Sequence, residues 1–422
     1  MAELKRGGVI RTKNFKQVKI LDKLGEGGQG IVYKVDFHGE IKALKWYFGK
    51  AIKDPAKFYA NLENNIKTGK PTEAFLWPEE ITEPSGDTFG YIMPLRPPEF
   101  VDFSKFLIGR AQFAGLTAMT NAALEIVSGF RALHNKGYSY QDLNDGNFFV
   151  NPKTGGVLIC DNDNVSAFGK NSGIAGKARY MSPEVVVGGA PNTQSDRFSL
   201  SVILFMLWTN SHPLEGKAAC PPCMDAKNER RIYGEAPIFI FDPNDPTNRP
   251  VQGLHRGAIL RYPLLPQYLQ DEFAKAFSKE VMRDPSKRII EQEWLRLFIR
   301  MRGEVYKCAN HKCGNVYFAD PAQPTNCPDC GKTAQFFGYI KTPRYNLPIH
   351  QKTKLYACHS HKDNDDFATL IGQVNASASG FTLKNLSGKS WTIGGETIEP
   401  NGEAALVKGA TIDFDGSTAE IV

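Results

Sequence analysis

The opening part of the chain alternates apolar and polar side chains in the way that β-strands do. Residues 15–47 contain the runs FKQVKILDKL, GIVYKVDFHG and EIKALKWY, in which Ile31, Tyr33 and Val35 occupy every second position. Because alternate residues of a strand share one face, this stretch predicts β-hairpins, one of them turning at Gly39.

Further along, the spacing of apolar residues lengthens to the three or four residues of an amphipathic helix. It predicts a short helix over 54–69, a helical pattern from about residue 104 onward, and further helices over 195–209 and 269–302. A β-rich start followed by a helix-rich body is the order expected of a two-lobed α+β protein.

The character of the chain changes after about residue 303. Cysteine and turn residues dominate 308–331, and from 335 to 422 short strand-like runs alternate with Gly, Asn, Ser and Asp turns. This pattern predicts a small cysteine-rich segment followed by a β-sandwich-like C-terminal domain.

Composition places the chain among ordinary globular proteins. It has 422 residues, 41% of them hydrophobic and 23% charged, and a net charge of +6, which allows two or three domains. No lysine or arginine block indicates a nucleic-acid partner, and the apolar run 199–208 is shorter than the roughly 18 residues that span a membrane. The start, MAELKRGGVI, lacks the apolar run of a signal peptide, so we expect a cytoplasmic protein without a membrane partner.

A glycine-rich segment lies between two of the predicted strands. Residues 25–30 read GEGGQG, which matches G-x-G-x-x-G, and Val32 follows it. Glycine lets backbone amides approach phosphate oxygens without a Cβ clash, although an ordinary turn would use the same residues. The segment joins two strands and does not open a helix, which argues against a dinucleotide-binding fold. On the strand that follows, Lys45 is a compact cation able to reach phosphates.

The segment YSYQDLNDGNFFV, residues 138–150, carries a possible base and a possible metal ligand. Asp142, Leu143 and Asn147 have the offsets of the motif H-R-D-L-x-x-x-N. Asp142 would orient a hydroxyl and accept its proton, and Asn147 would ligate a magnesium ion.

A second metal carboxylate is expected after a turn and a strand. The run VLIC, residues 157–160, supplies the strand, and Asp161 follows it directly. Asp163 is a rival ligand, but Asp161 fits the strand end better. Two oxygen ligands of this kind suit a hard cation that keeps water and phosphate in its shell.

Four further segments have the order and spacing of known kinase motifs. They are ARYMSPE (178–184), SDRFSLSVILFML (195–207), HPLEG (212–216) and DPSKRIIEQEW (284–294). By this resemblance Asp196 would anchor the backbone of the 138–150 loop. Arg288 would form a buried ion pair with Glu184, whose loss would be costly.

Together these motifs resemble those of eukaryotic-like bacterial Ser/Thr protein kinases. The resemblance implies a kinase domain over 15–302 with an N-lobe over 15–95 and a C-lobe over 96–302. It also implies a protein substrate, ATP, and Mg²⁺ or Mn²⁺. Its catalytic residues would be Asp142, Lys45 and Glu63, with Glu63 pairing Lys45, and its metal ligands Asn147 and Asp161. The residues implied to bind the nucleotide are Gly25, Gly27, Gly28, Gly30, Val32, Ala43, Lys45, Met93, Leu95 and Phe149.

Within that family, the insertion-like stretch 233–255 resembles one subgroup. Its members occur with von Willebrand A-domain proteins and PP2C-type phosphatases in tellurite-resistance-like gene systems. The resemblance implies such proteins as partners, in bacterial stress or signalling.

Three positions depart from the family pattern. Gln141 replaces an Arg, as in non-RD kinases, so control by loop phosphorylation is not expected. Asn144 replaces the Lys that steadies the γ-phosphate, which predicts slower transfer. Asp163 replaces a Gly.

These departures leave a second hypothesis open, a nucleotide-binding pseudokinase scaffold acting through its C-terminal modules. A third, a small-molecule kinase of the aminoglycoside type, is disfavoured by the Ser182-Pro183-Glu184 segment and Arg288.

The cysteine-rich segment resembles a zinc ribbon over 303–334. Its candidate ligands are Cys308, Cys313, Cys327 and Cys330, with His311 able to replace one of them and free thiols as the alternative. Four thiolates would make a closed structural Zn²⁺ site for a segment too small for its own core. The other pair, Cys220 and Cys223, has no second cysteine pair nearby in the sequence. We therefore interpret these two cysteines as structural or redox-inactive. Cys358, His359 and His361 are read as incidental.

The last region, 335–422, resembles a forkhead-associated domain. The run LKNLSGKSW stands where that family has a characteristic turn. No phosphothreonine-binding Arg is evident, and Gln373 lies nearest its place. A generic protein-contact or intramolecular module therefore remains an alternative to phosphopeptide binding.

Overall fold

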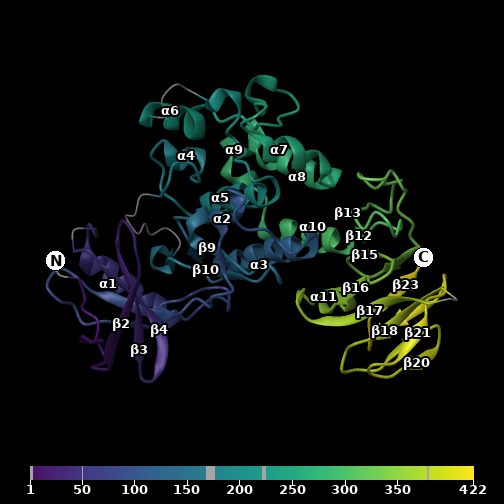
Figure 1. Cartoon of the computed structure of the whole chain (residues 1–422), viewed down its shortest axis with the longest axis horizontal. Helices are drawn as coiled ribbons and strands as arrows, with labels where there is room; N and C mark the ends of the chain where they lie inside the picture. Colours follow the sequence, from purple (N-terminus) through teal and green to yellow (C-terminus); the bar gives the residue numbers. More distant parts are fainter. Residues whose placement is uncertain (1–2, 50, 168–175, 221–224, 378–379) are drawn as a thin grey trace. The chain divides into compact units, whose positions relative to one another are not determined.

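The computed structural model describes residues 3–49, 51–167, 176–220, 225–377 and 380–422. The chain forms two compact units (Figure 1). The first consists of Met1–Ala114, Glu125–Pro263 and Gln270–Gln292, and the second of Gly115–Leu124, Leu264–Leu269 and Glu293–Val422.

The first unit begins with an antiparallel six-stranded sheet in the order β1-β2-β3-β4-β6-β5. The hairpins predicted over 15–47 are confirmed, and the β3–β4 turn has left-handed backbone at His38 and Gly39 (φ 55° and 83°). The strands are β1 (Val9–Arg11), β2 (Gln17–Glu26), β3 (Gly30–Phe37), β4 (Glu40–Tyr47), β5 (Glu80–Ile81) and β6 (Gly90–Pro94).

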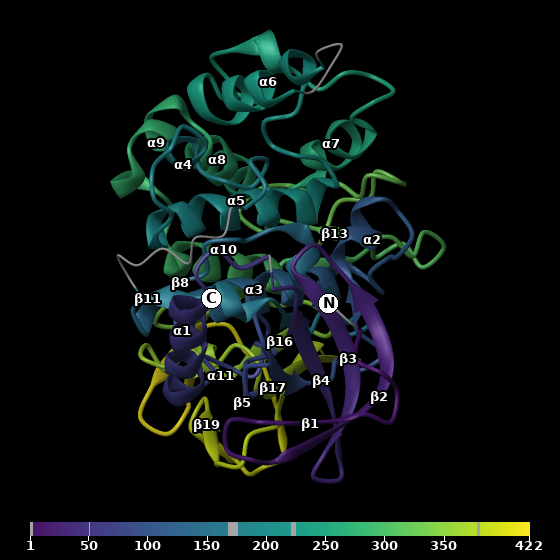
Figure 2. The same ribbon diagram turned by 90° about the vertical axis from the view of Figure 1, so that its left-hand side faces the viewer.

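Apolar side chains pack on both faces of this sheet, which explains why its central strands are buried. Helix α1 (Pro55–Thr68) lies near the sheet in Figure 2 and buries Phe58 and Leu62 against Tyr47 and Met93. Asp54 caps the helix, accepting a hydrogen bond from the Lys57 amide, and Pro55 occupies its first turn. The helix predicted over 54–69 is therefore confirmed.

The remainder of the first unit is mainly helical. Helix α5 (Thr193–Thr209) is buried along most of its length and begins with a capping box made by Asn192 and Ser195. The single helix predicted over 269–302 is wrong, because Ser278 and Pro285 start new elements within it. Other helices that lie wholly or partly in this unit are α2 (Phe103–Leu107), α3 (Leu116–Asn135), α4 (Pro183–Val186), α6 (Ala226–Arg230), α7 (Arg256–Arg261), α8 (Gln267–Ala276), α9 (Lys279–Arg283) and α10 (Glu291–Gly303).

Two small strand layers carry the polar loops of this unit. One has the order β10-β9-β7, and the other pairs β11 with β8. Their short lengths leave the intervening loops free to present side chains. The strands are β7 (Val101–Asp102), β8 (Tyr138–Ser139), β9 (Phe148–Val150), β10 (Val157–Ile159) and β11 (Ser166–Ala167).

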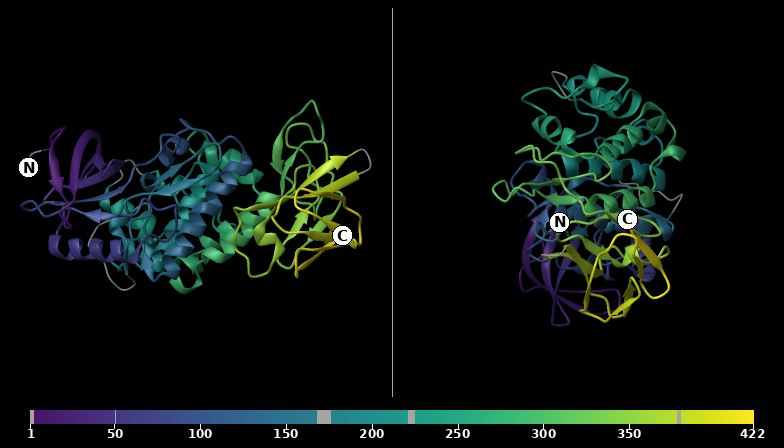
Figure 3. Two further views of the ribbon diagram at one scale, coloured as in Figure 1. Left: turned by 90° about the horizontal axis from the view of Figure 1, so that it is seen from below. Right: turned by 90° about the vertical axis from the view of Figure 1, so that its right-hand side faces the viewer.

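The second unit is rich in β-sheet after α10, as the yellow part of the chain shows in Figure 3. It contains the pair β12-β13 and two sheets, β15-β14-β23-β22-β19-β20 and β16-β17-β18-β21. The strands are β12 (Val305–Lys307), β13 (Val316–Phe318), β14 (Tyr339–Lys341), β15 (Asn346–Pro348), β16 (Lys354–Tyr356), β17 (Leu370–Ser377), β18 (Gly380–Asn385), β19 (Trp391–Ile393), β20 (Glu396–Ile398), β21 (Glu403–Ala405), β22 (Thr411–Asp413) and β23 (Thr418–Ile421).

Polar contacts join the end of α10 to the strand region inside this second unit. Arg302 donates to the Phe367 carbonyl oxygen at 2.7 Å, and its guanidinium lies 3.5 Å from the ring centre of Tyr356. The sequence-based domain limits stay predictions. Within the described residues, no helix combines the length and apolar character needed to cross a membrane.

Candidate active site

A buried carboxylate anchors the backbone of the 138–150 loop. Asp196, in the first turn of α5, accepts hydrogen bonds from the amides of Tyr140 (2.6 Å) and Gln141 (3.0 Å). The expected anchoring role of Asp196 is therefore confirmed. Gln141 has left-handed backbone (φ 70°), a conformation that costs a non-glycine residue about 1–2 kcal/mol and needs such support.

A charged network lies behind this anchor. His134 of α3 contacts Asp196 through Nε2 (3.2 Å) and Glu291 through Nδ1 (2.8 Å), and Arg197 donates to the same Glu291. Burial disfavours the charged imidazole, but hydrogen bonds to the two carboxylates outweigh it and raise the pKa of His134 to about 9. The loop is thus held by a network of two basic side chains, His134 and Arg197, and two carboxylates, Asp196 and Glu291.

Asp142 lies at the centre of the loop with its carboxylate partly buried. Oδ1 accepts a hydrogen bond from Asn144 (3.3 Å) and Oδ2 one from Asn164 (3.5 Å). Burial, with the negative charge of Asp161, raises the pKa of Asp142 to about 6. A carboxylate with that pKa is a better proton acceptor than an ordinary aspartate.

The strand pairing brings the two expected metal ligands close in the backbone. Phe148 pairs with Ile159, and the Cys160 amide donates to the Asn147 carbonyl oxygen (2.9 Å), so Asn147 lies opposite the residue before Asp161. The Asn147 side-chain amide donates to Tyr140 Oη and to the Asp142 carbonyl oxygen. Its own amide oxygen can therefore face a cation.

Lys45 is held by two carboxylates from the segment after β10. Its Nζ lies 3.1 Å from Asp161 Oδ1 and 2.7 Å from Asp163 Oδ2. Tyr47 also donates to Asp163 Oδ2. Asp163 has no exposed side-chain surface, whereas 42% of the Asp161 side chain is exposed.

The expected ion pair between Lys45 and Glu63 is wrong. Glu63 contacts Lys13 at the surface, because α1 turns the face with Phe58, Leu62 and Asn65 inward and leaves Glu63 partly exposed. From the sequence, Asp163 was expected only as an alternative metal ligand, and its role as the counter-ion of Lys45 was missed. The signal was present, since Asp161-Asn162-Asp163 offers two carboxylates where one metal ligand was needed.

The glycine-rich segment forms the turn between β2 and β3. Gln29 within it accepts a hydrogen bond from Lys45 Nζ at 3.3 Å. A Cβ on Gly30 would lie 2.2 Å from the Trp46 carbonyl oxygen, so sheet packing alone requires glycine there. At Gly27 and Gly28 a Cβ would meet no atom within 4 Å, which leaves room above the backbone amides.

Apolar residues expected to contact a nucleotide base converge on one cluster. Ala43 and Met93 belong to it, Val32 and Leu95 pack against it, and Ala43 and Met93 are paired across β4 and β6. Phe149 lies opposite Leu158 in β9-β10, and its ring is covered by the Arg96 guanidinium at 4.4 Å.

Leu158 and Cys160 also pack against this cluster and were missed in the sequence. The alternation of burial along β10 was the available signal, because Leu158 faces the side opposite Val157 and Ile159.

The segment that follows residues 168–175, which lie outside the described residues, is joined by ion pairs to the helical part of the first unit. Arg288 makes a two-bond contact with Glu184 (2.8 and 2.6 Å), so that predicted pair is confirmed. Arg179 pairs with Glu215 in the same way. A small pocket opens between this segment and the loop at Asp142, lined in part by Leu143, Lys177, Tyr180, Met181 and Val185.

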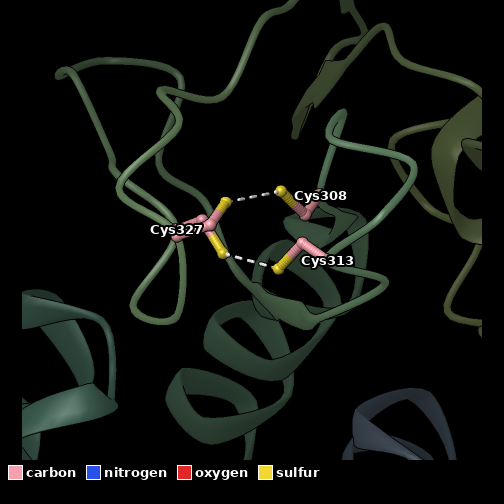
Figure 4. Close-up of side chains that lie close together, drawn as sticks. Cys308, Cys313 and Cys327 are labelled. Carbon is pink, nitrogen blue, oxygen red and sulfur yellow. Dashed lines mark hydrogen bonds between the residues drawn. The ribbon is translucent and has the colours of Figure 1, made fainter.

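Four thiols gather in the segment around β12 and β13. The sulfur atoms of Cys308, Cys313, Cys327 and Cys330 all lie within 4.8 Å of one another (Figure 4). Cys308 lies 3.5 Å from Cys330, and Cys313 lies 3.6 Å from Cys327. His311 does not belong to this group of described side chains.

Three other residues singled out in the sequence, Cys220, His359 and Gln373, belong neither to the candidate active site nor to the four thiols among the described side chains. Cys220 lies in the first unit, and Cys223 is outside the described residues. His359 is buried and accepts a hydrogen bond from the Tyr356 amide, while Gln373 contacts Asn375 within β17.

Comparison with known proteins gives one family. The protein kinase domain model matches residues 98–296. A probable serine/threonine-protein kinase of Corynebacterium efficiens is 28% identical over 207 residues, covering 46% of this chain and 31% of that protein. Another, the probable serine/threonine-protein kinase PknB of Corynebacterium glutamicum, is 29% identical over 105 residues, covering 23% of this chain and 16% of that protein.

Among solved structures, the kinase domain of Mycobacterium tuberculosis PknI is similar with a TM-score of 0.48 and 15% identity. The match covers 70% of this chain and 98% of that one.

These findings define a similarity: residues 98–296 are similar to the protein kinase domain, and the two curated relatives carry the name serine/threonine-protein kinase. The matched stretch includes the Asp142 loop, Asp161 and the Glu184–Arg288 pair. The chain spans about a third or less of the length of these two curated relatives.

Proposed function

We propose that this chain is an ATP- and Mg²⁺-dependent kinase that transfers the γ-phosphate to Ser or Thr hydroxyls of a protein substrate. The observation that carries the proposal is the cluster formed by Lys45, Asp161 and Asp163 beside the Asp142–Asn147 loop. Two carboxylates, one amine and one amide from three separate segments meet in one compact unit.

Each residue of this cluster has a role that its contacts support. Asp142 orients the substrate hydroxyl and accepts its proton, and its raised pKa suits that task. Asn147 and Asp161 hold the metal, which when bound neutralises charge on the phosphates. Asp161 fits because its side chain is partly exposed and bonded to one lysine only through Oδ1.

Lys45 faces the phosphates while Asp163 fixes it from behind. Asp163 is fully buried and is held by Tyr47 as well, so its bond to Lys45 is the permanent one. Asp163 Oδ1 has no partner among the described residues, so the carboxylate is bonded there through Oδ2 alone, to Lys45 and Tyr47. The family glutamate is thus replaced by an aspartate from the metal loop.

The nucleotide fits between the glycine-rich turn and the apolar cluster. The open space at Gly27 and Gly28 allows amides to reach phosphate oxygens, with Gly25 and Gly30 shaping the turn. Val32, Ala43, Met93, Leu95 and Phe149 would contact the base, together with Leu158.

A nucleotide-binding pseudokinase scaffold is the second candidate. It is favoured by Asn144, which brings no charge to the loop, and by Gln141 in place of an arginine. Retention of Lys45, Asp142, Asn147 and Asp161 in one cluster favours the enzyme. Gln141 supports a non-RD kinase that is not controlled by loop phosphorylation.

We further propose that the four thiols bind a structural Zn²⁺. Tetrahedral zinc with sulfur at about 2.3 Å places its ligands about 3.8 Å apart, close to the 3.5 and 3.6 Å of the two cysteine pairs. Burial opposes ionisation of Cys327, but the backbone amides of Cys330 and Asp329 lower the pKa of its thiol to about 6. Thiolate character of this kind suits the metal.

The C-terminal strands are proposed to serve protein contacts in a forkhead-associated-like module over 335–422. Two sheets meet there, because a Cβ on Gly372 of β17 would lie 3.1 Å from Trp391 of β19. The partners implied by the family resemblance, a von Willebrand A-domain protein and a PP2C-type phosphatase, are proposed on that resemblance alone, as is a cytoplasmic location.

The experiment is transfer of the γ-phosphate from labelled ATP with Mg²⁺, using the wild-type chain and Asp142→Asn. We expect phosphorylated Ser or Thr with wild type and a loss of roughly 10²–10⁴-fold in the variant. Nucleotide binding should survive in both. Equal trace activity of the two proteins, with ATP binding intact, would remove the enzyme in favour of the scaffold.

A further inference from the structure

Asn144 occupies the loop position where a cation would steady the transferred phosphate. Its side chain is fully engaged: Nδ2 donates to the Asp142 carbonyl oxygen (3.1 Å) and to Asp142 Oδ1 (3.3 Å), and Oδ1 accepts from the Gly146 amide (3.1 Å). The residue is 3% exposed, so it cannot swing outward to meet a ligand. An amide in this position supplies order but no charge.

A lysine from another segment reaches the same oxygen. Lys177 Nζ donates to Asn144 Oδ1 at 3.0 Å and lies 3.8 Å from Asp145. Its side chain is 61% exposed, so the amine faces solvent on one side and the loop on the other. Position 144 lacks a positive charge, but Lys177 brings one within hydrogen-bond distance of the Asn144 side chain.

The backbone around Lys177 is built to approach the loop closely. A Cβ on the preceding Gly176 would lie 3.0 Å from Asp142 Oδ1, which is tighter than most Cβ contacts in proteins. On the other side, the Tyr180 amide donates to the Lys177 carbonyl oxygen (2.9 Å), and Ser199 donates to the Tyr180 carbonyl oxygen (2.6 Å). The lysine side chain is long and exposed, but its backbone is held by the hydrogen bond from Tyr180.

The other lysine of the site, Lys45, is bonded to Asp161 and Asp163, and within the described part of the chain it forms no hydrogen bond or ion pair with the Asp142 side chain. With Asp142, Asp145, Asp161 and Asp163 nearby, the centre is rich in negative charge. A second cation beside Asp142 would offset it where the transferred group must pass.

We propose that Lys177 is a catalytic residue of the proposed kinase reaction. It contacts the γ-phosphoryl group during transfer, and Asn144 holds it there. In the reaction the bond from phosphorus to the ADP oxygen breaks, a bond to the substrate hydroxyl oxygen forms, and the hydroxyl proton passes to Asp142. Lys177 stays protonated throughout and stabilises charge on the phosphoryl oxygens. This inference rests on the proposed function and adds to it a residue from outside the loop.

The contact can be tested by exchanging the two side chains. Lys177→Met should lower kcat by roughly 10²-fold, as loss of one electrostatic donor does. Adding Asn144→Lys to that variant returns a cation to the loop and should recover at least about ten-fold of the loss. Lys153→Met, which removes an exposed lysine from a surface turn, serves as the matched control and should leave kcat unchanged.

A binding measurement tests the same lysine without turnover. Calorimetric affinities for ADP and for a non-hydrolysable ATP analogue with Mg²⁺ give the contribution of the γ-phosphate. Lys177→Met should reduce the preference for the analogue by about five-fold, the value of one screened contact near 4 Å, and leave ADP affinity unchanged. Lys177→Arg should retain part of the preference, because it keeps the charge.

The outcomes separate the two proposals. If wild type transfers phosphate and Lys177→Met keeps wild-type kcat and analogue preference, the role of Lys177 is refuted and the kinase stands. If wild type transfers nothing, the kinase proposal fails, and an unchanged analogue preference in Lys177→Met then refutes the lysine contact as well. Suppose that Lys177→Met is folded and that adding Asn144→Lys does not restore kcat. The proposal that a positive charge at this place stabilises the phosphoryl group is then also refuted.

Discussion

Two polar centres of this protein are built from different chemistry and completed to different degrees. Around Lys45, oxygen and nitrogen groups of opposite charge satisfy one another inside the first unit. Around Cys327, four thiols face one another in the second unit, and their cluster contains only a few large apolar side chains, chiefly Tyr306 and Tyr317. The first centre is held by its own ion pairs, whereas we propose that the second depends on bound Zn²⁺ in order to fold.

The difference follows from the amount of core behind each centre. Lys45 extends from a sheet with apolar clusters on both faces, so burial of its partners is supported from several sides. The strands β12 and β13 have three residues each and form a sheet of their own. A two-stranded sheet is marginal in water without further support, and the proposed Zn²⁺ would supply it.

Removal of the metal should destabilise the protein more than any of the substitutions below. A small effect would contradict the contrast between the two centres. Cys327→Ser, or chelation of the metal, should unfold residues 305–334, because structural zinc sites contribute about 10–16 kcal/mol at neutral pH. Elemental analysis should give one zinc per wild-type chain, and hydrogen exchange should show lost protection at β12 and β13 alone. Cys220→Ser, an exposed cysteine outside the cluster, is the matched control. A zinc-free wild-type chain with normal protection would contradict the account.

Breaking the ion pair at Lys45 should come next. Lys45→Met leaves the buried Asp163 carboxylate without its cation, which should lower the free energy of unfolding by about 3–5 kcal/mol. Lys13→Met removes the surface partner of Glu63 and should change it by less than about 1 kcal/mol. Denaturant unfolding of both variants checks the difference. Equal losses would mean that Lys45 and Asp163 are not a fixed pair.

The two units should also respond to pH in opposite directions. His134 has a pKa raised to about 9 in the folded chain against 6.5 unfolded, so its contribution is complete below pH 6.5 and is lost as pH rises through 9. That loss is about 3 kcal/mol, because each pKa unit corresponds to 1.36 kcal/mol. The cysteine cluster should instead lose its metal in acid, as the thiolates take up protons.

Denaturant unfolding of the first unit between pH 6 and 10 measures the alkaline effect. His134→Gln should be less stable at pH 6 and should show little further loss up to pH 10. An equally steep loss of stability in His134→Gln would assign the pH dependence to other groups.

Part of the site could be placed from the sequence. The Asp196 anchor and the Glu184–Arg288 pair join residues far apart in the chain and were implied by the resemblance to protein kinases, and the structure forms both. The hairpins over 15–47 follow from alternation, and the gathering of four cysteines follows from their clustered spacing.

What the sequence could not show is which partner a side chain chooses across segments. Glu63 lies at a suitable distance along the chain from Lys45, but rotation of α1 about its axis decides which face turns inward. Asp163 lies in the short turn Asn162–Asn164, which begins after the left-handed backbone of Asp161 (φ 54°), and no pattern in the sequence relates this turn to Lys45. The contact of Lys177 with Asn144 likewise joins segments that no periodic pattern relates.

The most direct test of the account is the rate of γ-phosphate transfer by Glu63→Gln, measured against wild type at saturating ATP and Mg²⁺. Because Asp163 holds Lys45, the account predicts a rate within about two-fold of wild type, as expected for a surface pair. A folded Glu63→Gln variant that loses about 10²-fold or more would contradict it, since Glu63 would then be the partner of Lys45 in the reacting enzyme.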